Sequence, residues 1–155
     1  MNLKAEQLNE HLSSQGLSET YIISGDEPVL VQDCADTIRR QAAANGYSER
    51  KVFHVDSKFD WNTILFEVDN MSLFSEKKFM EIRIISGKPG EKGSKVIQEY
   101  LQKIPKKTLT LFISPKLDHS TNKSKWFTAI TKAGISVQTW PIASIQLPHW
   151  LNNQL

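Results

Sequence analysis

The sequence has one cysteine and no long apolar run, and each shortage excludes a class of protein. Cys34 has no second cysteine to pair with, so an internal disulfide is excluded and a reducing compartment is indicated. No apolar run approaches the roughly 18 residues that a membrane helix needs. Residues 1–6 also lack the apolar core of a signal peptide. We therefore expect a cytoplasmic protein with no membrane partner.

Constellations that carry catalysis or bind metals are missing as well. The chain has no Gly-x-Ser-x-Gly elbow and no evident Cys–His arrangement. Cys34 follows Leu30 by four residues and precedes Ile38 by four, which indicates a thiol packed on a buried helix face rather than a nucleophile. The histidines are dispersed without the spacing of a metal site: His11, His54, His119 and His149. We predict no catalytic residue, no metal and no cofactor.

A phosphate-binding loop is also absent from the place where an ATPase would carry it. Such a loop follows a strand and contains two glycines, a lysine and a hydroxyl residue. Its backbone amides and the lysine ammonium group bind the phosphate. Gly25 ends a predicted strand, but no second glycine, lysine and hydroxyl follow it at the required spacing. The apolar residues Val29-Leu30-Val31 stand in that place instead. In the segment 87–94, Lys92 and Gly93 stand in reversed order and follow a different strand.

A strand that ends in carboxylates, which would hold magnesium, is missing too. The strongest strand pattern, Leu109–Ile113, runs into Ser114-Pro115 instead. We therefore expect a domain that neither binds nor hydrolyses ATP.

The chain does have enough apolar residues for one core and an uneven distribution of charge. Its 155 residues are 39% hydrophobic and 23% charged, which is typical of one globular domain. Residues 1–75 hold 6 Lys and Arg against 12 Asp and Glu, and residues 76–155 hold 13 against 5. A basic half of this kind fits either a surface for nucleic acid or an acidic partner, or ordinary solvated helix faces.

Helical and strand patterns alternate along the chain. Apolar spacing predicts helices over 3–15, 28–45, 61–71, 96–104 and 126–133. Runs of β-branched and aromatic residues predict strands over 20–24, 51–55, 79–85, 108–113 and 135–140. We interpret residues 87–93 as a flexible loop. The alternation predicts a three-layer α/β domain with a mainly parallel sheet of about five strands, the strand 108–113 being central.

The end of the helix 61–71 is the most informative stretch. Its buried stripe consists of residues at helical spacing: Trp61, Ile64, Leu65, Val68 and Met71. Leu73 and Phe74 follow that stripe and precede the charged residues 76–78. They either fold back onto the core or are covered by a partner, because two large apolar side chains at a wet helix end cost free energy.

Asn70-Met71-Ser72-Leu73-Phe74 resembles the short motif by which proteins dock on the bacterial sliding clamp. Its setting is similar to the N-terminal domain of the delta subunits of the DNA polymerase III clamp loader. Further collinear segments carry the same resemblance: Tyr21–Pro28, Asp60–Asn62, Trp126–Ala129 and Gln146–Trp150. The motif departs at Asn70, where clamp-binding peptides prefer glutamine.

The resemblance implies an AAA+ nucleotide-binding-type domain over residues 1–140, without a working phosphate loop, followed by the start of a truncated helical lid domain over 141–155. It implies a subunit that is not an enzyme on its own but belongs to the DNA polymerase III holoenzyme, a DNA-directed DNA polymerase and nucleotidyltransferase. Asn70, Met71, Ser72, Leu73 and Phe74 would bind the sliding clamp, the beta subunit, and favour ring opening during DNA replication. Further implied partners are the gamma/tau and delta prime subunits, reached through C-terminal domains, and DNA within the assembled loader.

The alternative function is a basic nucleic-acid-binding module without enzymatic activity. Lysines of the second half would neutralise phosphates in that case: Lys103, Lys106, Lys107, Lys123 and Lys125. An ATPase with a divergent loop is a third and weaker alternative, since the lysine and the carboxylates are missing.

Overall fold

The structure, a computed structural model, describes residues 2–47, 49–71, 77–86, 88–104, 108–117 and 121–139. Within them lies one six-stranded sheet in the order β1-β6-β2-β5-β4-β3, and every pair of neighbours is parallel. The strands are β1 (Asn2–Lys4), β2 (Thr20–Gly25), β3 (Glu49–Val55), β4 (Lys78–Ile84), β5 (Thr108–Pro115) and β6 (Ile135–Gln138). The α-helices are α1 (Leu8–Gln15), α2 (Pro28–Ala44), α3 (Asn62–Met71), α4 (Gly90–Lys103) and α5 (Lys125–Ala133), with 3-10 turns at Ala5–Gln7 and Thr121–Lys123.

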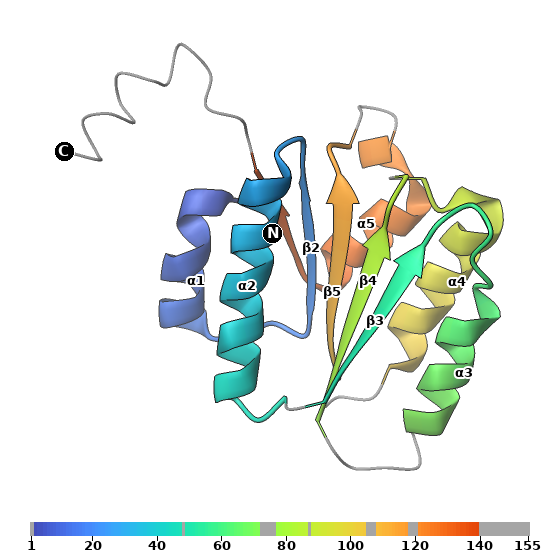
Figure 1. Cartoon of the computed structure of the whole chain (residues 1–155), viewed down its shortest axis with the longest axis horizontal. Coiled ribbons are helices and arrows are strands. Elements are labelled where there is room, and N and C mark those ends of the chain that lie inside the picture. The colour runs from blue at the N-terminus through green and yellow to red at the C-terminus, as the bar shows by residue number, and fades with distance from the viewer. Residues whose placement is uncertain are drawn as a thin grey trace.

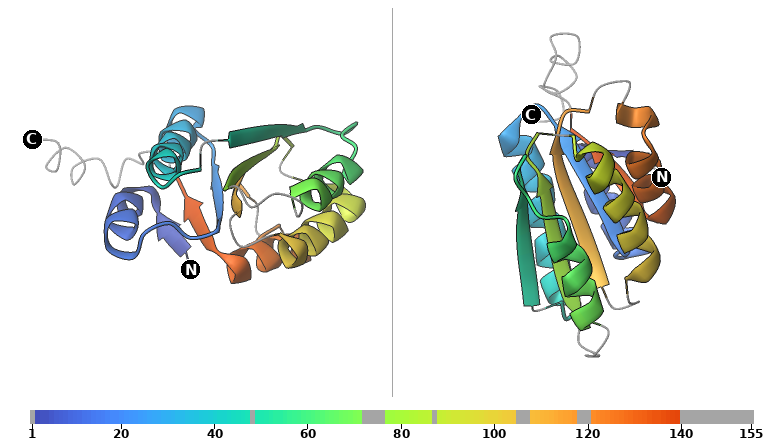
Figure 2. Two further views of the ribbon diagram at one scale, coloured as in Figure 1. Left: turned by 90° about the horizontal axis from the view of Figure 1, so that it is seen from below. Right: turned by 90° about the vertical axis from the view of Figure 1, so that its right-hand side faces the viewer.

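The helices form two layers around the sheet, as the alternating pattern predicts (Figures 1 and 2). One core contains Leu8, Cys34, Ile38, Leu109 and Leu111 and lies beneath α1 and α2. The other core contains Trp61, Ile64, Tyr100, Phe112 and Trp126 and lies beneath α3, α4 and α5. The predicted three-layer α/β architecture is therefore confirmed.

Strand β5 is the central strand that the sequence predicts. It pairs with β2 on one side and with β4 on the other, and Thr108–Phe112 are buried. The polar side chain of Thr110, at the centre of the strand, has a hydrogen-bond partner, because its Oγ1 lies 2.6 Å from the Tyr100 hydroxyl of α4. Burial on both faces explains why the strand does not alternate between buried and exposed residues.

Helix α2 begins and ends where its sequence signals lie. Pro28 is at the first helical position, where a missing N–H costs nothing. Gly46 follows the helix with φ of 92°, a left-handed conformation that favours glycine. Cys34 is buried, and desolvation raises the pKa of its thiol to about 11, so it is a packed thiol as predicted. Leu30 was expected on the same buried face but is half-buried.

The N-terminal prediction was wrong in one respect. A single helix was expected from Leu3, whereas residues 2–4 form β1, which pairs with β6 through Leu3 and Val137. Helix α1 then begins at Leu8 after one 3-10 turn. Hydrogen bonds to a distant strand override the local helical pattern here, and three residues are too few to show a period of two. The described sheet consequently has six strands rather than about five.

The predicted flexible loop 87–93 was also wrong in its second half. Helix α4 begins at Gly90, and Gly93 is buried against the indole of Trp61. A Cβ at position 93 would lie 2.5 Å from Trp61 Cζ2. Gly93 therefore permits a close approach of α4 to Trp61, and a glycine-rich composition was misread as looseness.

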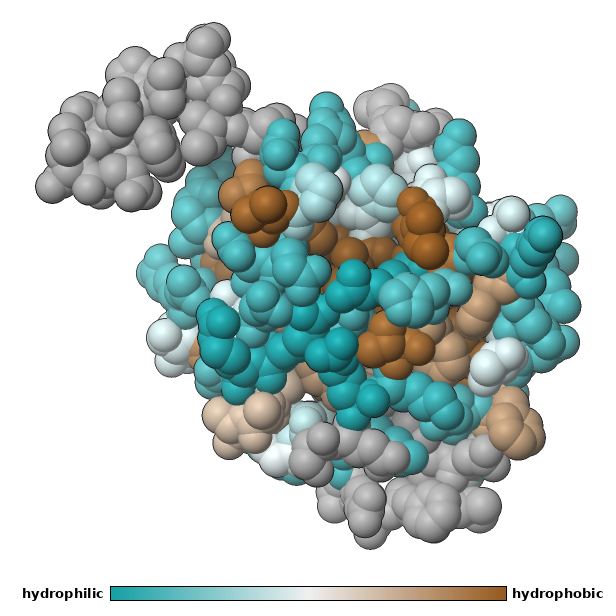
Figure 3. Space-filling view, in the orientation of Figure 1, coloured by the Kyte–Doolittle hydropathy of each residue, from teal (hydrophilic) through white to brown (hydrophobic). Residues whose placement is uncertain are grey.

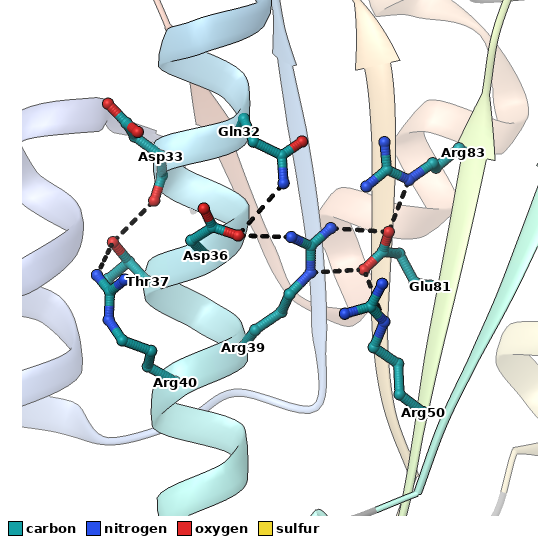
Figure 4. Close-up of polar contacts among 9 residues, drawn as sticks. All are labelled: Gln32, Asp33, Asp36, Thr37, Arg39, Arg40, Arg50, Glu81 and Arg83. Carbon is teal, nitrogen blue, oxygen red and sulfur yellow. Dashed lines mark hydrogen bonds and ion pairs between the residues drawn. The ribbon is translucent and has the colours of Figure 1, made fainter.

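A buried carboxylate ties α2 to β4 (Figure 4). Glu81 is fully buried and accepts two hydrogen bonds of 2.8 Å from Arg39 and one of 2.7 Å from Arg83. Arg50 Nε lies 3.6 Å from the same carboxylate, and Arg39 also contacts Asp36. Burial raises the pKa of Glu81, but the hydrogen bonds and charges of Arg39 and Arg83 outweigh it, so that pKa lies below its ordinary value.

This cluster occupies a part of the sheet that no described helix covers. Beyond α2, no described helix lies over this face of β4 and β3, and hydrophilic side chains gather there (Figures 1 and 3). Arg50 and His54 of the edge strand β3 are exposed on this side. The three arginines therefore shield one carboxylate where helix packing ends.

Candidate functional site

Helix α3 is held firmly at its beginning. Asp60 Oδ1 accepts a 3.0 Å hydrogen bond from the backbone N–H of Asn62, which satisfies a donor at the start of the helix. Trp61 is buried, and its ring meets that of Phe59 edge-on at 5.4 Å. The direction of α3 is thus set by its first turn.

The inner face of α3 is the predicted apolar stripe. Ile64 and Val68 are buried in the core beneath α3 and α4, and Leu65 packs against it. On the flank, Glu67 accepts a 3.2 Å hydrogen bond from Lys51 of β3. Phe66 lies on the other side of the helix with 64% of its surface exposed. Phe66 is not among the site residues predicted from the sequence, although an aromatic residue outside the buried stripe was a signal for it.

The five predicted clamp-binding residues are described only in part. Asn70 and Met71 form the end of α3, and the structure does not describe their side chains. Ser72, Leu73 and Phe74 lie outside the described residues. The structure therefore locates where this segment leaves α3, and its contacts stay a prediction.

The chain after this segment is attached to the end of α2. Lys77 Nζ donates a 2.7 Å hydrogen bond to the carbonyl oxygen of Asn45, and it lies 5.3 Å from the centroid of the Tyr47 ring. A cation here also suits the negative end of the α2 dipole. The end of α3 and Lys77 therefore both lie at the end of the molecule where β3 and β4 begin (Figure 1).

The opposite end of the sheet is where parallel α/β folds usually bind ligands. There, Thr139 covers the end of β2: its N–H donates a 2.9 Å hydrogen bond to the Ser24 carbonyl oxygen, and its hydroxyl donates to the same oxygen at 3.3 Å. A Cβ on Gly25 would lie 1.7 Å from Thr139 Oγ1. Lys116 and Asp26 form a 3.8 Å ion pair beside it. This end of β2 is filled by the chain itself.

The start of α2 offers little to a phosphate. Pro28 has no N–H to donate, and the N–H of Val31 is used by the Glu27 carbonyl oxygen. The first two side chains of this helix, Pro28 and Val29, are both exposed and apolar. Among the described residues, no group of three or more His, Cys, Asp or Glu could hold a metal ion. The described helices also include none that is long and apolar enough to cross a membrane.

The residues behind the alternative nucleic-acid reading are not brought together by a described surface. Lys103 forms a 3.1 Å ion pair with Glu99 on α4. Lys123 and Lys125 are exposed near the start of α5. Lys106 and Lys107 lie outside the described residues. In the described part of the chain, the nucleic-acid-binding hypothesis is thus supported by two exposed lysines, whereas a third lysine is paired with a glutamate.

Comparison with solved structures assigns the fold to a class. The chain is similar to the Bacillus subtilis DNA clamp loader delta protein, with a TM-score of 0.69 and 14% identity over 96% of this chain and 46% of that one. At this identity the likeness establishes the three-layer α/β fold of a clamp loader delta protein.

Comparison with sequences then identifies the family. Residues 21–139 match the family model for the DNA polymerase III delta subunit, so the chain belongs to that family. It is 28% identical over 151 residues to the DNA polymerase III subunit delta of Escherichia coli K12, and 29% identical over 154 residues to that of Haemophilus influenzae. These alignments cover 97% and 96% of this chain but 44% of each relative, so the chain spans less than half of their length. The resemblance drawn from the sequence is confirmed.

Proposed function

We propose that this chain is the part of a non-catalytic clamp-loader subunit that binds the sliding clamp of DNA polymerase III through Asn70, Met71, Ser72, Leu73 and Phe74. The observation that carries the proposal is the path of α3, whose buried stripe leads to Asn70 and Met71 at one end of the molecule. Membership of the delta subunit family supports it independently. Leu73 and Phe74 enter an apolar pocket of the clamp, and Asn70 and Ser72 set the register by polar contacts.

Anchoring alone does not open a ring. A ligand favours the open clamp only by binding it more tightly than the closed one, so further contacts must sense the curvature of the clamp. The firm seating of α3 supports this role, because a helix fixed by Asp60, Trp61 and its inner stripe transmits a displacement instead of absorbing it. We thus propose that α3 acts as a rigid element that anchors the clamp, and that a separate contact senses the curvature of the clamp.

The same subunit does no ATP chemistry of its own in this proposal. Its support is the filled end of β2, where Thr139 covers Gly25 and Pro28 replaces a donor. The polymerase reaction belongs to the complex, a DNA-directed DNA polymerase and transferase of the cytoplasm. The proposal has four further parts. The domain is of the AAA+ type, and residues 141–155 are the start of a helical lid domain. Its partners are the gamma/tau and delta prime subunits, together with DNA within the loader.

A titration of the chain with purified sliding clamp tests this function. We expect saturable binding to the clamp, and no saturable heat with magnesium-ATP in the same calorimeter. Duplex DNA is the second control, run at low and moderate salt because phosphate contacts weaken steeply as salt rises. Clamp binding absent while DNA binds with a steep salt dependence would replace the proposal by the nucleic-acid-binding alternative.

A further inference from the structure

An exposed aromatic side chain lies on the helix that leads to the proposed clamp-binding residues. Among the described residues, three large hydrophobic side chains are strongly exposed: Val29 at 69%, Phe66 at 64% and Ile85 at 56%. Single exposed apolar residues are ordinary on protein surfaces. Position distinguishes these three, because Val29 is in the first turn of α2 and Ile85 follows β4, both at one end of the sheet, whereas Phe66 is on α3, the helix that runs to the other end (Figure 1).

Helix geometry makes Phe66 continuous with the proposed site. Ile64 and Val68, two residues before and after it, are buried in the core, so Phe66 lies on the outward side of α3. Residues four apart in an α-helix lie one above the other, about 6 Å along the axis. Asn70, the first residue of the proposed site, is therefore the next position on the same side of the helix.

The surroundings of Phe66 are those of an interface rather than of a core. The described positions Asn62 and Thr63 earlier on α3 are exposed and polar. On the flank, Lys51 and Glu67 form an ion pair whose lysine is about half exposed. An apolar anchor with a polar and charged rim is the usual composition of a protein–protein contact.

We propose that Phe66 is a further anchor for the sliding clamp, extending the contact by one helical turn from Asn70 back along α3. The inference rests on the proposed function, and it commits the outward side of α3 to an apolar surface of the clamp beside the pocket that receives Leu73 and Phe74. It predicts that the clamp contacts a helix side as well as a short peptide. Affinity for the folded chain then exceeds the affinity for a peptide of residues 70–74.

The test is a clamp titration of the full chain with Phe66→Ala and matched variants. We expect Phe66→Ala to weaken clamp binding by about 5- to 30-fold, the range of an interface anchor of middle rank. Phe66→Leu retains apolar area and should stay within about threefold of the parent. Val29→Ala removes a side chain of similar exposure at the other end and should leave affinity unchanged. Alanine is the best helix former, so α3 keeps its fold, which circular dichroism verifies.

The outcomes separate the inference from the proposed function. If the parent chain does not bind the clamp, both fail. If the parent binds and Leu73→Ala with Phe74→Ala abolishes binding while Phe66→Ala binds as the parent does, only this inference fails. Sedimentation of the same variants covers another occupant: loss of self-association in Phe66→Ala at unchanged clamp affinity would assign this side of α3 to a second copy of the chain and overturn the proposal.

Discussion

The two ends of the parallel sheet differ in what they leave available. At the end where β2 and β6 finish, Thr139 covers Gly25 and an ion pair of Asp26 with Lys116 lies beside it. At the other end lies the end of α3, a helix whose outward side carries the exposed Phe66. Folds of this type usually bind ligands at the first of these ends. The comparison teaches that a shared architecture need not keep its usual site, and the proposed function therefore uses the accessible surface of α3.

The largest expected effect comes from removing the proposed anchors at the α3 end. Leu73→Ala with Phe74→Ala should abolish clamp binding, because central interface anchors cost about 2–4 kcal/mol each, roughly 30- to 1,000-fold in affinity. The sequence puts both residues beyond the buried stripe, so the loss of stability should be well under half of the about 2–5 kcal/mol of a core truncation. Thermal melting and clamp titration of one protein sample measure both. A melt that collapses together with binding would place the pair in the core.

The next largest effect concerns the cluster of Glu81 and its three arginines, which lies between the two ends of the sheet. Glu81→Gln should destabilise the fold by about 3 kcal/mol at neutral pH, because three arginines lose a buried carboxylate partner. Urea unfolding at neutral pH measures this difference. Clamp binding should not change, since Glu81 is on β4, is held by Arg39 of α2 and is not part of α3.

The pH dependence of that difference identifies its cause. The pKa of Glu81 is lower in the folded protein than its ordinary value of 4.5, so its contribution is complete above pH 4.5 and is lost as the pH falls through the folded pKa. The gap between the parent and Glu81→Gln should therefore close in acid. A gap of equal size at neutral and at acidic pH would mean that shape, not charge, explains the destabilisation.

A smaller effect tests whether the β2 end is truly filled. Gly25→Ala should destabilise by about 2 kcal/mol, because its Cβ would overlap Thr139 Oγ1. In a Thr139→Ala background the same substitution should cost less, and a double-mutant cycle of urea unfolding measures the coupling. Additive costs would contradict the packing of Thr139 on Gly25. Clamp affinity of Gly25→Ala should match that of the parent, which sharpens the contrast between the two ends.

The smallest expected effect is none at all. Calorimetry with magnesium-ATP at about millimolar concentration should give no saturable heat, because the β2 end lacks the lysine and glycines of a phosphate loop. A folded sample that binds the clamp is the positive control. Saturable ATP binding would show that this end retains a ligand site.

The sequence predicted the elements whose patterns are long. Helix α2 has a proline at its start, a glycine after its end and five buried residues at helical spacing, and β5 is a run of apolar residues and threonines. Each gives a strong local signal that agrees with its tertiary role. Resemblance in five collinear segments then supplied the family, which the match over residues 21–139 confirms.

The features that escaped prediction depend on contacts between distant segments. Gly93 lies near the start of α4 and leaves room for the Trp61 indole, and nothing near Gly93 in sequence indicates that contact. Glu81 is a charged residue in a strand whose burial requires Arg39, 42 residues away. Phe66 was visible as an aromatic residue off the stripe, but its exposure becomes informative only beside the end of α3.

The pairing of β1 with β6 has a consequence for synthesis on the ribosome. Leu3 of β1 pairs with Val137 of β6, and among the described strands β6 is the partner of β1. At ordinary translation rates the intervening chain takes on the order of 10 s to emerge. During that time β6 is not available to pair with residues 2–4, and these residues must avoid pairing with the edge strands of other sheets. The strand that is made first is therefore joined last.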